Sequence, residues 1–108
     1  MGQHEFQSGA DGEGLLLLSG EFNLADGGGL KAALQDALGR APARLTLDLR
    51  QVAQPGLPFF QLLFALAAQA RKVKRRVSLK GPLPEQFLSA AGALGISLVD
   101  FEQTFDLE

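Results

Sequence analysis

The sequence predicts an α/β fold whose sheet is mostly parallel. Stretches with strand character alternate along the chain with stretches in which apolar residues recur at helical spacing. Strands that alternate with helices are joined by right-handed crossovers, which place successive strands parallel. The chain has 108 residues, of which 46% are hydrophobic and 20% charged, as is usual for one globular domain. We therefore expect a single domain over residues 1–108.

The first part of the chain is expected to form two strands and a helix. Residues 5–8 suit a short edge strand, and the leucine run 15–18, between glycines, suits a buried strand. Residues 23–29 are expected to form a glycine-rich loop. Apolar residues then recur at helical spacing over 29–38, and Gly39 is expected to cap that helix.

The middle of the chain predicts a strand followed by a long helix. Residues 44–49 alternate between polar and apolar, as in a strand. Pro58 suits the first turn of a helix over 58–72, where no intrahelical N–H bond is lost. The apolar face of that helix is expected to hold Phe59, Leu62, Leu63, Leu66, Ala70 and Val73, whereas Phe60 and Phe64 fall on the border between its two faces.

The last part of the chain predicts a strand, a helix and a final strand. Residues 76–79 have strand character, and the proline-rich stretch 81–84 leads into a helix that ends at Gly95. Residues 96–101 are expected to be the last strand. Phe105 is expected to anchor a short final turn or helix.

The composition excludes several classes of function. The chain has no cysteine and a single histidine, His4, so thiolate chemistry and a Ser-His-Asp triad are not expected. We expect no enzyme activity, no cofactor and no metal site. A net charge of −2 argues against a general nucleic-acid binder. Neither a signal peptide nor a membrane-spanning stretch is recognisable, so a cytoplasmic location is expected.

Three segments in series resemble one family. They are Leu18–Leu24 followed by a leucine-rich helix, the strand Leu45–Val52 ending in Asp-Leu-x-x-Val, and Val77–Gly81 followed by a helix closing in Ala93–Ile96. From about Phe6 to Phe105 the chain resembles the STAS domain of anti-sigma-factor antagonists. The resemblance implies a mixed sheet of four or five strands with helices packed on one side.

The resemblance also implies a non-enzymatic, protein-binding regulatory role in bacterial signalling. The implied partner is a histidine-kinase-like anti-sigma factor or another sensory or chemotaxis component, bound by a monomer or weak dimer. Similar STAS subunits bind the ATPase of an ABC-type phospholipid transporter, which is an alternative. A third alternative is a nucleotide or small ligand bound at the loop after Asp48, although in the family this aspartate mainly orders the loop.

One departure from the family pattern concerns its phosphorylation site. The family's Asp-Ser-Ser-Gly loop corresponds here to Gly56–Phe59, and Pro58 occupies the position of the phosphate acceptor. Residues 53–63 contain no Ser, Thr or Tyr. We therefore expect a variant that is not switched by phosphorylation there.

In place of the switch, the sequence offers a fixed apolar contact surface. The expected partner-binding residues are Pro55, Gly56, Leu57, Pro58, Phe59, Phe60, Gln61 and Phe64. The alternative is that the aromatic residues belong to the core. For Phe59 the helical phase favours the core, whereas for Phe60 both alternatives stay open.

Two further segments have a functional and an ordinary interpretation. The basic cluster Arg71–Arg76 could contact an anionic partner, but cations at a helix C-terminus also complement the helix dipole, which we favour. Residues 27–29, three glycines before a helix, could cradle a phosphate. They lack the lysine and spacing of a P-loop, so a flexible loop is expected.

Overall fold

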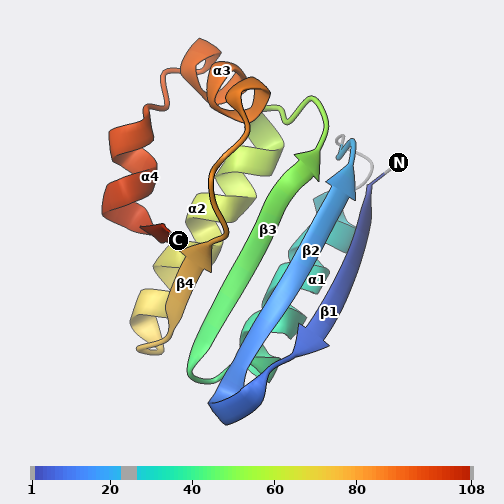
Figure 1. Ribbon diagram of the computed structural model, residues 1–108, viewed down its shortest axis with the longest axis vertical. Helices are drawn as coiled ribbons and strands as arrows, with labels where there is room; N and C mark the ends of the chain where they lie inside the picture. The colour runs from blue at the N-terminus through green and yellow to red at the C-terminus, as the bar shows by residue number, and fades with distance from the viewer. Residues whose placement is uncertain (1, 23–26, 108) are drawn as a thin grey trace.

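A five-stranded sheet forms the centre of the protein in the computed structural model, which describes residues 2–22 and 27–107. The strands lie in the order β1 (Gln3–Ser8), β2 (Glu13–Gly20), β3 (Arg44–Val52), β4 (Arg76–Leu79) and β5 (Asp106–Leu107). β1 is antiparallel to β2, and every other neighbouring pair is parallel. The predicted α/β class and mostly parallel sheet are therefore confirmed (Figure 1).

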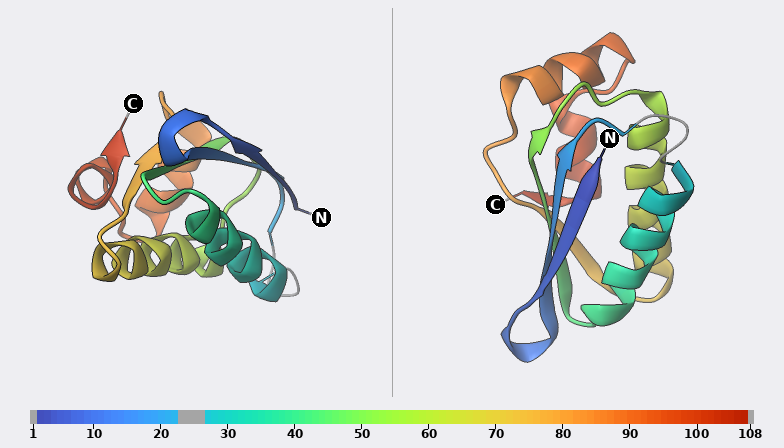
Figure 2. Two further views of the ribbon diagram at one scale, coloured as in Figure 1. Left: turned by 90° about the horizontal axis from the view of Figure 1, so that it is seen from below. Right: turned by 90° about the vertical axis from the view of Figure 1, so that its right-hand side faces the viewer.

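The two longest helices cover one face of the sheet. They are α1 (Gly27–Arg40) and α2 (Leu57–Lys72), which lie side by side behind the sheet in Figure 1 and to its right in the right-hand view of Figure 2. α3 (Glu85–Ala93) lies beyond the end of β3, and α4 (Leu98–Thr104) lies beside α2 near β5. Within the described residues, no helix covers the opposite face of β1, β2 and β3, which we call the open face.

The leucine-rich strands supply the core beneath α1 and α2. Leu16 and Leu18 of β2 are 1% exposed, and Leu45, Leu47 and Leu49 of β3 are fully buried. Leu15 and Leu17 alternate with them and are half-buried on the open face. Because β2 is a central strand with apolar residues on both faces, its sequence is a continuous leucine run.

Phenylalanine rings join the helices to one another. The centroids of Phe60 and Phe87 lie 5.2 Å apart, those of Phe87 and Phe101 5.6 Å, and those of Phe64 and Phe101 5.5 Å. These distances lie within the range in which aromatic pairs attract beyond their burial alone. The cluster holds α3 and α4 against α2.

The prediction of a last strand over residues 96–101 is wrong, because helix α4 begins at Leu98. Ser97 caps it: its Oγ accepts a hydrogen bond from the backbone N–H of Asp100 (3.3 Å), whose carboxylate accepts one from the N–H of Ser97 (2.8 Å). This reciprocal pair is a capping box, which satisfies two free N–H groups at a helix start. The last strand is β5, and Phe105, which was predicted to anchor a short final turn or helix, is the buried C-cap of α4.

The start and end of α1 also differ from the prediction. Residues 27–29, predicted as part of a loop, belong to the helix, and residues 23–26 of that loop lie outside the described residues. The helix does not end at Gly39 but at Arg40. Arg75 reaches across from the end of α2 and donates a hydrogen bond from Nη1 to the carbonyl oxygen of Leu38 (2.6 Å). This contact satisfies a terminal carbonyl that a glycine cap would otherwise serve.

The predicted end of α3 is confirmed. Gly95 has a φ of +82°, a left-handed conformation that glycine adopts without strain. The N–H of Ile96 donates to the carbonyl oxygen of Ala91 (2.9 Å), and the N–H of Gly95 donates to that of Gly92 (3.0 Å). The pair forms a Schellman motif. Among the described helices, none has the length and apolarity needed to cross a membrane.

Candidate functional site

The loop between β3 and α2 brings the predicted contact segment to one end of the sheet. The N–H of Ala53 donates to the carbonyl oxygen of Gly20 (2.9 Å), and Gln54 turns the chain with a φ of +47°. Gly56 is the N-cap of α2 and has extended backbone angles, and Pro58 lies in the first turn. Because proline has no N–H, it fits a position where that group would be unpaired. The segment is thus held in a defined conformation.

Only some of the predicted contact residues reach the surface. Leu57 is 48% exposed and Gln61 is exposed, whereas Gly56, Pro58 and Phe64 are half-buried. Pro55, Phe59 and Phe60 are buried. In this conformation a partner can touch Leu57, Pro58 and Gln61, but not the buried three.

Phe60 is a core residue, which was one of the two alternatives left open for it, and Phe59 is a core residue, as its helical phase predicted. Both are 1% exposed. The ring of Phe60 contacts those of Phe59, Phe87 and Phe101, at centroid distances of 5.9, 5.2 and 6.2 Å. The idea of an exposed pair of phenylalanines is therefore corrected: α3 and α4 pack over the border of α2 on which Phe60 lies. Phe64 is mainly a core residue too, since its ring contacts Phe101 and Phe105.

A groove between α1 and α2 adjoins this surface, and the sequence reasoning did not identify it. A hollow of about 440 Å³ is lined by Gly28, Lys31, Pro58, Gln61, Leu62 and Ala65. A smaller one of about 50 Å³ continues it and shares Lys31, Leu62 and Ala65. The signal in the sequence was the absence of charge from residues 57–70, since the solvent side of a surface helix is normally polar.

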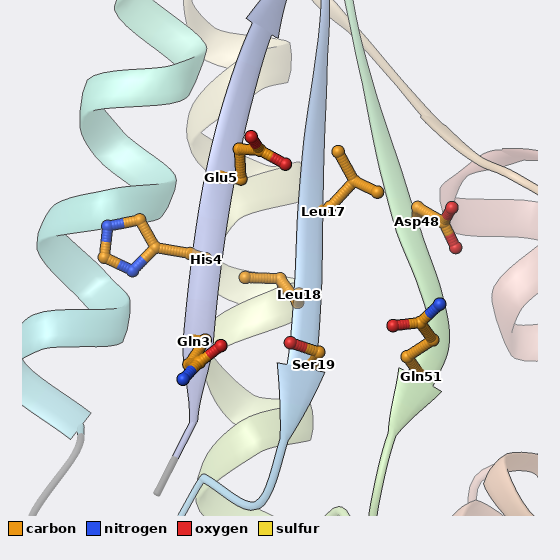
Figure 3. Close-up of a pocket in the computed structure, with 8 residues that line it drawn as sticks. All are labelled: Gln3, His4, Glu5, Leu17, Leu18, Ser19, Asp48 and Gln51. Carbon is orange, nitrogen blue, oxygen red and sulfur yellow. The ribbon is translucent and has the colours of Figure 1, made fainter.

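A second hollow lies on the open face of the sheet beside Asp48. It has a volume of about 400 Å³ and is lined by Gln3, His4, Glu5, Leu17, Leu18, Ser19, Asp48 and Gln51 (Figure 3). The register pairs Glu5 with Leu17 and Leu17 with Asp48, so these three residues form one row across three strands. His4 pairs with Leu18, whose side chain is buried on the helix-covered face, so its ring points away from the row toward α1.

The carboxylate of Asp48 is 6% exposed and is held by Arg50. Nε and the backbone N–H of Arg50 donate to Oδ1 at 3.0 and 3.1 Å, and Nη2 donates to Oδ2 at 2.9 Å. The hydrogen bonds from the Arg50 side chain keep the pKa of Asp48 below its ordinary value, although burial acts in the opposite direction. These hydrogen bonds join two residues of β3, and the loop-ordering role that the resemblance implied for Asp48 stays a prediction.

This hollow offers little to a nucleotide. Among the described residues that line it there is no Lys or Arg to bind phosphate, and the ring of His4, which could stack on a base, faces away. Arg50 is engaged by Asp48. No group of three or more His, Asp or Glu within the described residues could hold a metal ion.

The basic cluster at the end of α2 is partly used inside the protein. Arg75 binds the Leu38 carbonyl, and Nη2 of Arg76 lies 2.9 Å from the carboxylate of Asp106 in β5. Arg71 makes a long contact of 3.5 Å with the carbonyl oxygen of Gln103. Lys72 and Lys74 are exposed. Arg75 and Arg76 are thus engaged within the protein, and whether the remaining cations serve the helix dipole or a partner stays a prediction.

Comparison with solved structures finds the same fold in anti-sigma factor antagonists. A protein of Thermotoga maritima assigned to this class superposes with a TM-score of 0.73 at 14% identity, over 96% of this chain and 84% of the other. An antagonist from Mycobacterium paratuberculosis gives 0.68 at 20% identity, over 99% and 85%. SpoIIAA in its unphosphorylated form gives 0.69 at 12% identity, over 98% and 87%. At these identities the likeness establishes the fold.

Comparison of sequences identifies the family. No curated protein matches the chain. The model of the family described as "Mlab, STAS domain" matches residues 6–99, most of the 108 residues. This span runs from β1 into α4 and includes both the β3–α2 loop and the groove. The chain therefore belongs to the STAS domain family.

Proposed function

We propose that this chain is a non-enzymatic regulatory module that binds a protein partner through the start of α2. The observation that carries the proposal is the exposure of Leu57, 48%, beside Pro58 and Gln61 at the start of α2. An exposed leucine next to an apolar groove is a feature of interfaces. The fold shared with anti-sigma factor antagonists supports a regulatory role in bacterial signalling.

The proposed contact is not switched by phosphorylation. Pro58 occupies the acceptor position implied by the family pattern, and residues 53–63 hold no hydroxyl group. Introduction of a phosphate would add about two negative charges to the docking surface. Because that reaction has no acceptor here, we propose that recognition is constitutive.

The preferred partner is a histidine-kinase-like anti-sigma factor or a sensory or chemotaxis component in the bacterial cytoplasm. The names of the structural neighbours support this class. Incubation of the purified chain with ATP and the candidate kinase partner should leave its affinity for that partner unchanged in isothermal titration. A loss of affinity, with phosphate found by mass spectrometry elsewhere in the chain, would contradict constitutive recognition.

The contact surface is tested with two matched leucine variants. Leu57→Asp should weaken partner binding by about tenfold or more, because it places a charge at the centre of the interface. Leu94→Asp is the control, since Leu94 is similarly exposed (42%) at the end of α3. Isothermal titration with the purified partner gives both affinities. Equal affinities, or a loss only with Leu94→Asp, would move the interface elsewhere.

A second candidate is a STAS subunit of an ABC-type phospholipid transport complex. The match to the family model described as "Mlab, STAS domain" is compatible with this candidate, which rests on the resemblance to STAS subunits of such transporters. Co-purification of the tagged chain with an ABC-type ATPase, lost on Leu57→Asp, would support the transport role over the kinase partner. A small ligand in the Asp48 hollow is a weaker third candidate, which ligand-dependent thermal stabilisation would reveal.

A further inference from the structure

We propose that the groove between α1 and α2 binds an amphipathic helix of the protein partner, with an acidic side chain of that helix beside Lys31. The inference deepens the proposed function, since the groove begins at Pro58 and Gln61, which belong to the contact surface. It names the secondary structure and the charge of the segment that binds.

The shape of the groove suits a helix. Its two hollows share Lys31, Leu62 and Ala65, so they form one channel between the neighbouring helices. The half-buried Leu62 supplies an apolar side chain along it, and the buried Leu34 and Leu66 form its floor. A third helix laid between two others buries an apolar face at an interaxial distance of about 8–10 Å.

Small residues allow the close approach that such packing needs. Ala65 lies exposed in the channel, and a Cβ added to Gly28 would meet no atom within 4 Å. The two helices of the channel form their hydrogen bonds internally, so the channel walls offer no strand edge to pair with an extended peptide. A helix, which also satisfies its own backbone, is the matching occupant.

The charge of the channel selects an acidic helix. Within the part of the chain that the structure describes, its ten lining residues include one cation, Lys31, and three glutamines, Gln35, Gln61 and Gln69, but no carboxylate. Lys31 makes no ion pair within the described residues. Lys72, three residues beyond Gln69 and therefore on the same side of α2, adds a second exposed cation. In a chain of net charge −2, this is a local positive strip.

A second copy of this chain fits less well. A two-fold symmetric contact would place the same strip, with Lys31 and Lys72, on both sides of the interface. An acidic helix supplies the complementary charge instead.

The proposal is tested first with designed peptides. Three fluorescent peptides of about 18 residues, five helical turns, share one leucine face and carry glutamate flanks, lysine flanks, or glutamate flanks with two central prolines. Fluorescence anisotropy should show binding of the glutamate peptide, binding weaker by about tenfold or more for the lysine peptide, and none for the proline peptide. Absence of glutamate-peptide binding, or equal binding of all three, would overturn the proposal.

Matched variants locate the site. Ala65→Arg should lower the affinity for the glutamate peptide by about tenfold or more, because the arginine side chain fills the channel. Ala93→Arg places the same residue on the exposed end of α3 and should have no effect. Lys31→Glu should reverse the preference, so that the lysine peptide binds better. Thermal melts of all three variants check folding, and unchanged binding to Ala65→Arg would remove the groove as the site.

The natural partner separates this inference from the proposed function. If Leu57→Asp releases the partner and Ala65→Arg does not, the proposed function holds and the assignment of the groove as a binding site is wrong. Release by both variants supports both. If neither variant affects the complex, the proposed surface and the groove fail together.

Discussion

Arg50 donates three hydrogen bonds to the carboxylate of Asp48, two from its side chain and one from its backbone. The two residues lie where β3 and β2 lose their even register: β2 advances two residues, from Leu17 to Ser19, while β3 advances three, from Asp48 to Gln51. A β-bulge re-aims the side chains around it. The ion pair therefore fixes the shape of the strand that leads into the candidate contact loop.

Replacement of Asp48 should make stability depend less on pH. The pKa of Asp48 is lowered in the folded protein, so its contribution is complete above the unfolded pKa and is lost as pH falls through the folded pKa. Asp48→Asn should lower the free energy of unfolding by about 1–3 kcal/mol at pH 7, and by less below pH 4. Urea denaturation at pH 7 and below pH 4 measures the free energy of unfolding of both proteins.

The control for this prediction is Asp36→Asn. Asp36 lies 3.6 Å from Arg40, and its side chain is 65% exposed, so its replacement should change stability by less than about 0.5 kcal/mol. If Asp48→Asn lowers the free energy of unfolding by the same amount at both pH values, the charge of Asp48 does not stabilise the fold.

Phe60 and Leu57 should differ sharply in their effect on stability. Phe60→Ala removes a ring that is 1% exposed and joins α2 to α3 and α4, which should cost about 3–5 kcal/mol. Leu57→Ala, at a 48% exposed position, should cost less than about 1 kcal/mol. Chemical denaturation measures both. Similar costs would mean that Phe60 is not the core residue seen here.

The capping box should be visible as a stability effect confined to α4. Ser97→Ala removes the hydrogen bond from Ser97 Oγ to the N–H of Asp100 and should cost about 1 kcal/mol. Faster amide exchange is expected over residues 98–104. Ser89→Ala, at an exposed position inside α3, is the control and should have little effect. An equal change from both serines would argue against the box.

Two glycines should respond to alanine in opposite directions. A Cβ on Gly14 would lie 2.7 Å from Cζ of Phe6 and 3.0 Å from Cβ of Ala41, so Gly14→Ala should destabilise the protein by about 1–3 kcal/mol. A Cβ on Gly39 in α1 would meet nothing within 4 Å. Gly39→Ala should therefore stabilise by about 0.5–1 kcal/mol. Thermal melts decide, and a shift of the same sign in both variants would contradict this account.

Most of the fold could be predicted because its signals are local. The leucine run of β2 and the alternation of β3 are bounded by glycine and loop residues, and α2 shows the apolar spacing of a helix. The failure at residues 96–101 is instructive, since Ser97 and Asp100 form a recognisable helix-start pattern. A strand over residues 96–101 is nevertheless the wrong prediction, because the helix-start pattern at Ser97 and Asp100 outweighs the apolar character of Leu98, Val99 and Phe101.

The candidate site was less predictable because it depends on contacts between distant segments. Whether Phe60 faces solvent is decided by Phe87 and Phe101, which lie 27 and 41 residues later in the sequence. The groove exists because α1 and α2 pack side by side, which brings Lys31 next to Ala65. No spacing within either helix contains that information.

Because β5 is short, the C-terminal part of the protein should be the first to unfold locally. It joins the sheet through two residues of β4 only, Ser78 and Leu79, assisted by the Arg76–Asp106 pair. Local opening of α4 and β5 would therefore require less free energy than opening of β3. Such opening would expose Phe101 and Phe105 together with an unpaired edge of β4. Exposed apolar side chains and unpaired strand edges both promote aggregation. Proteolytic cleavage near α4 should therefore cause the domain to self-associate.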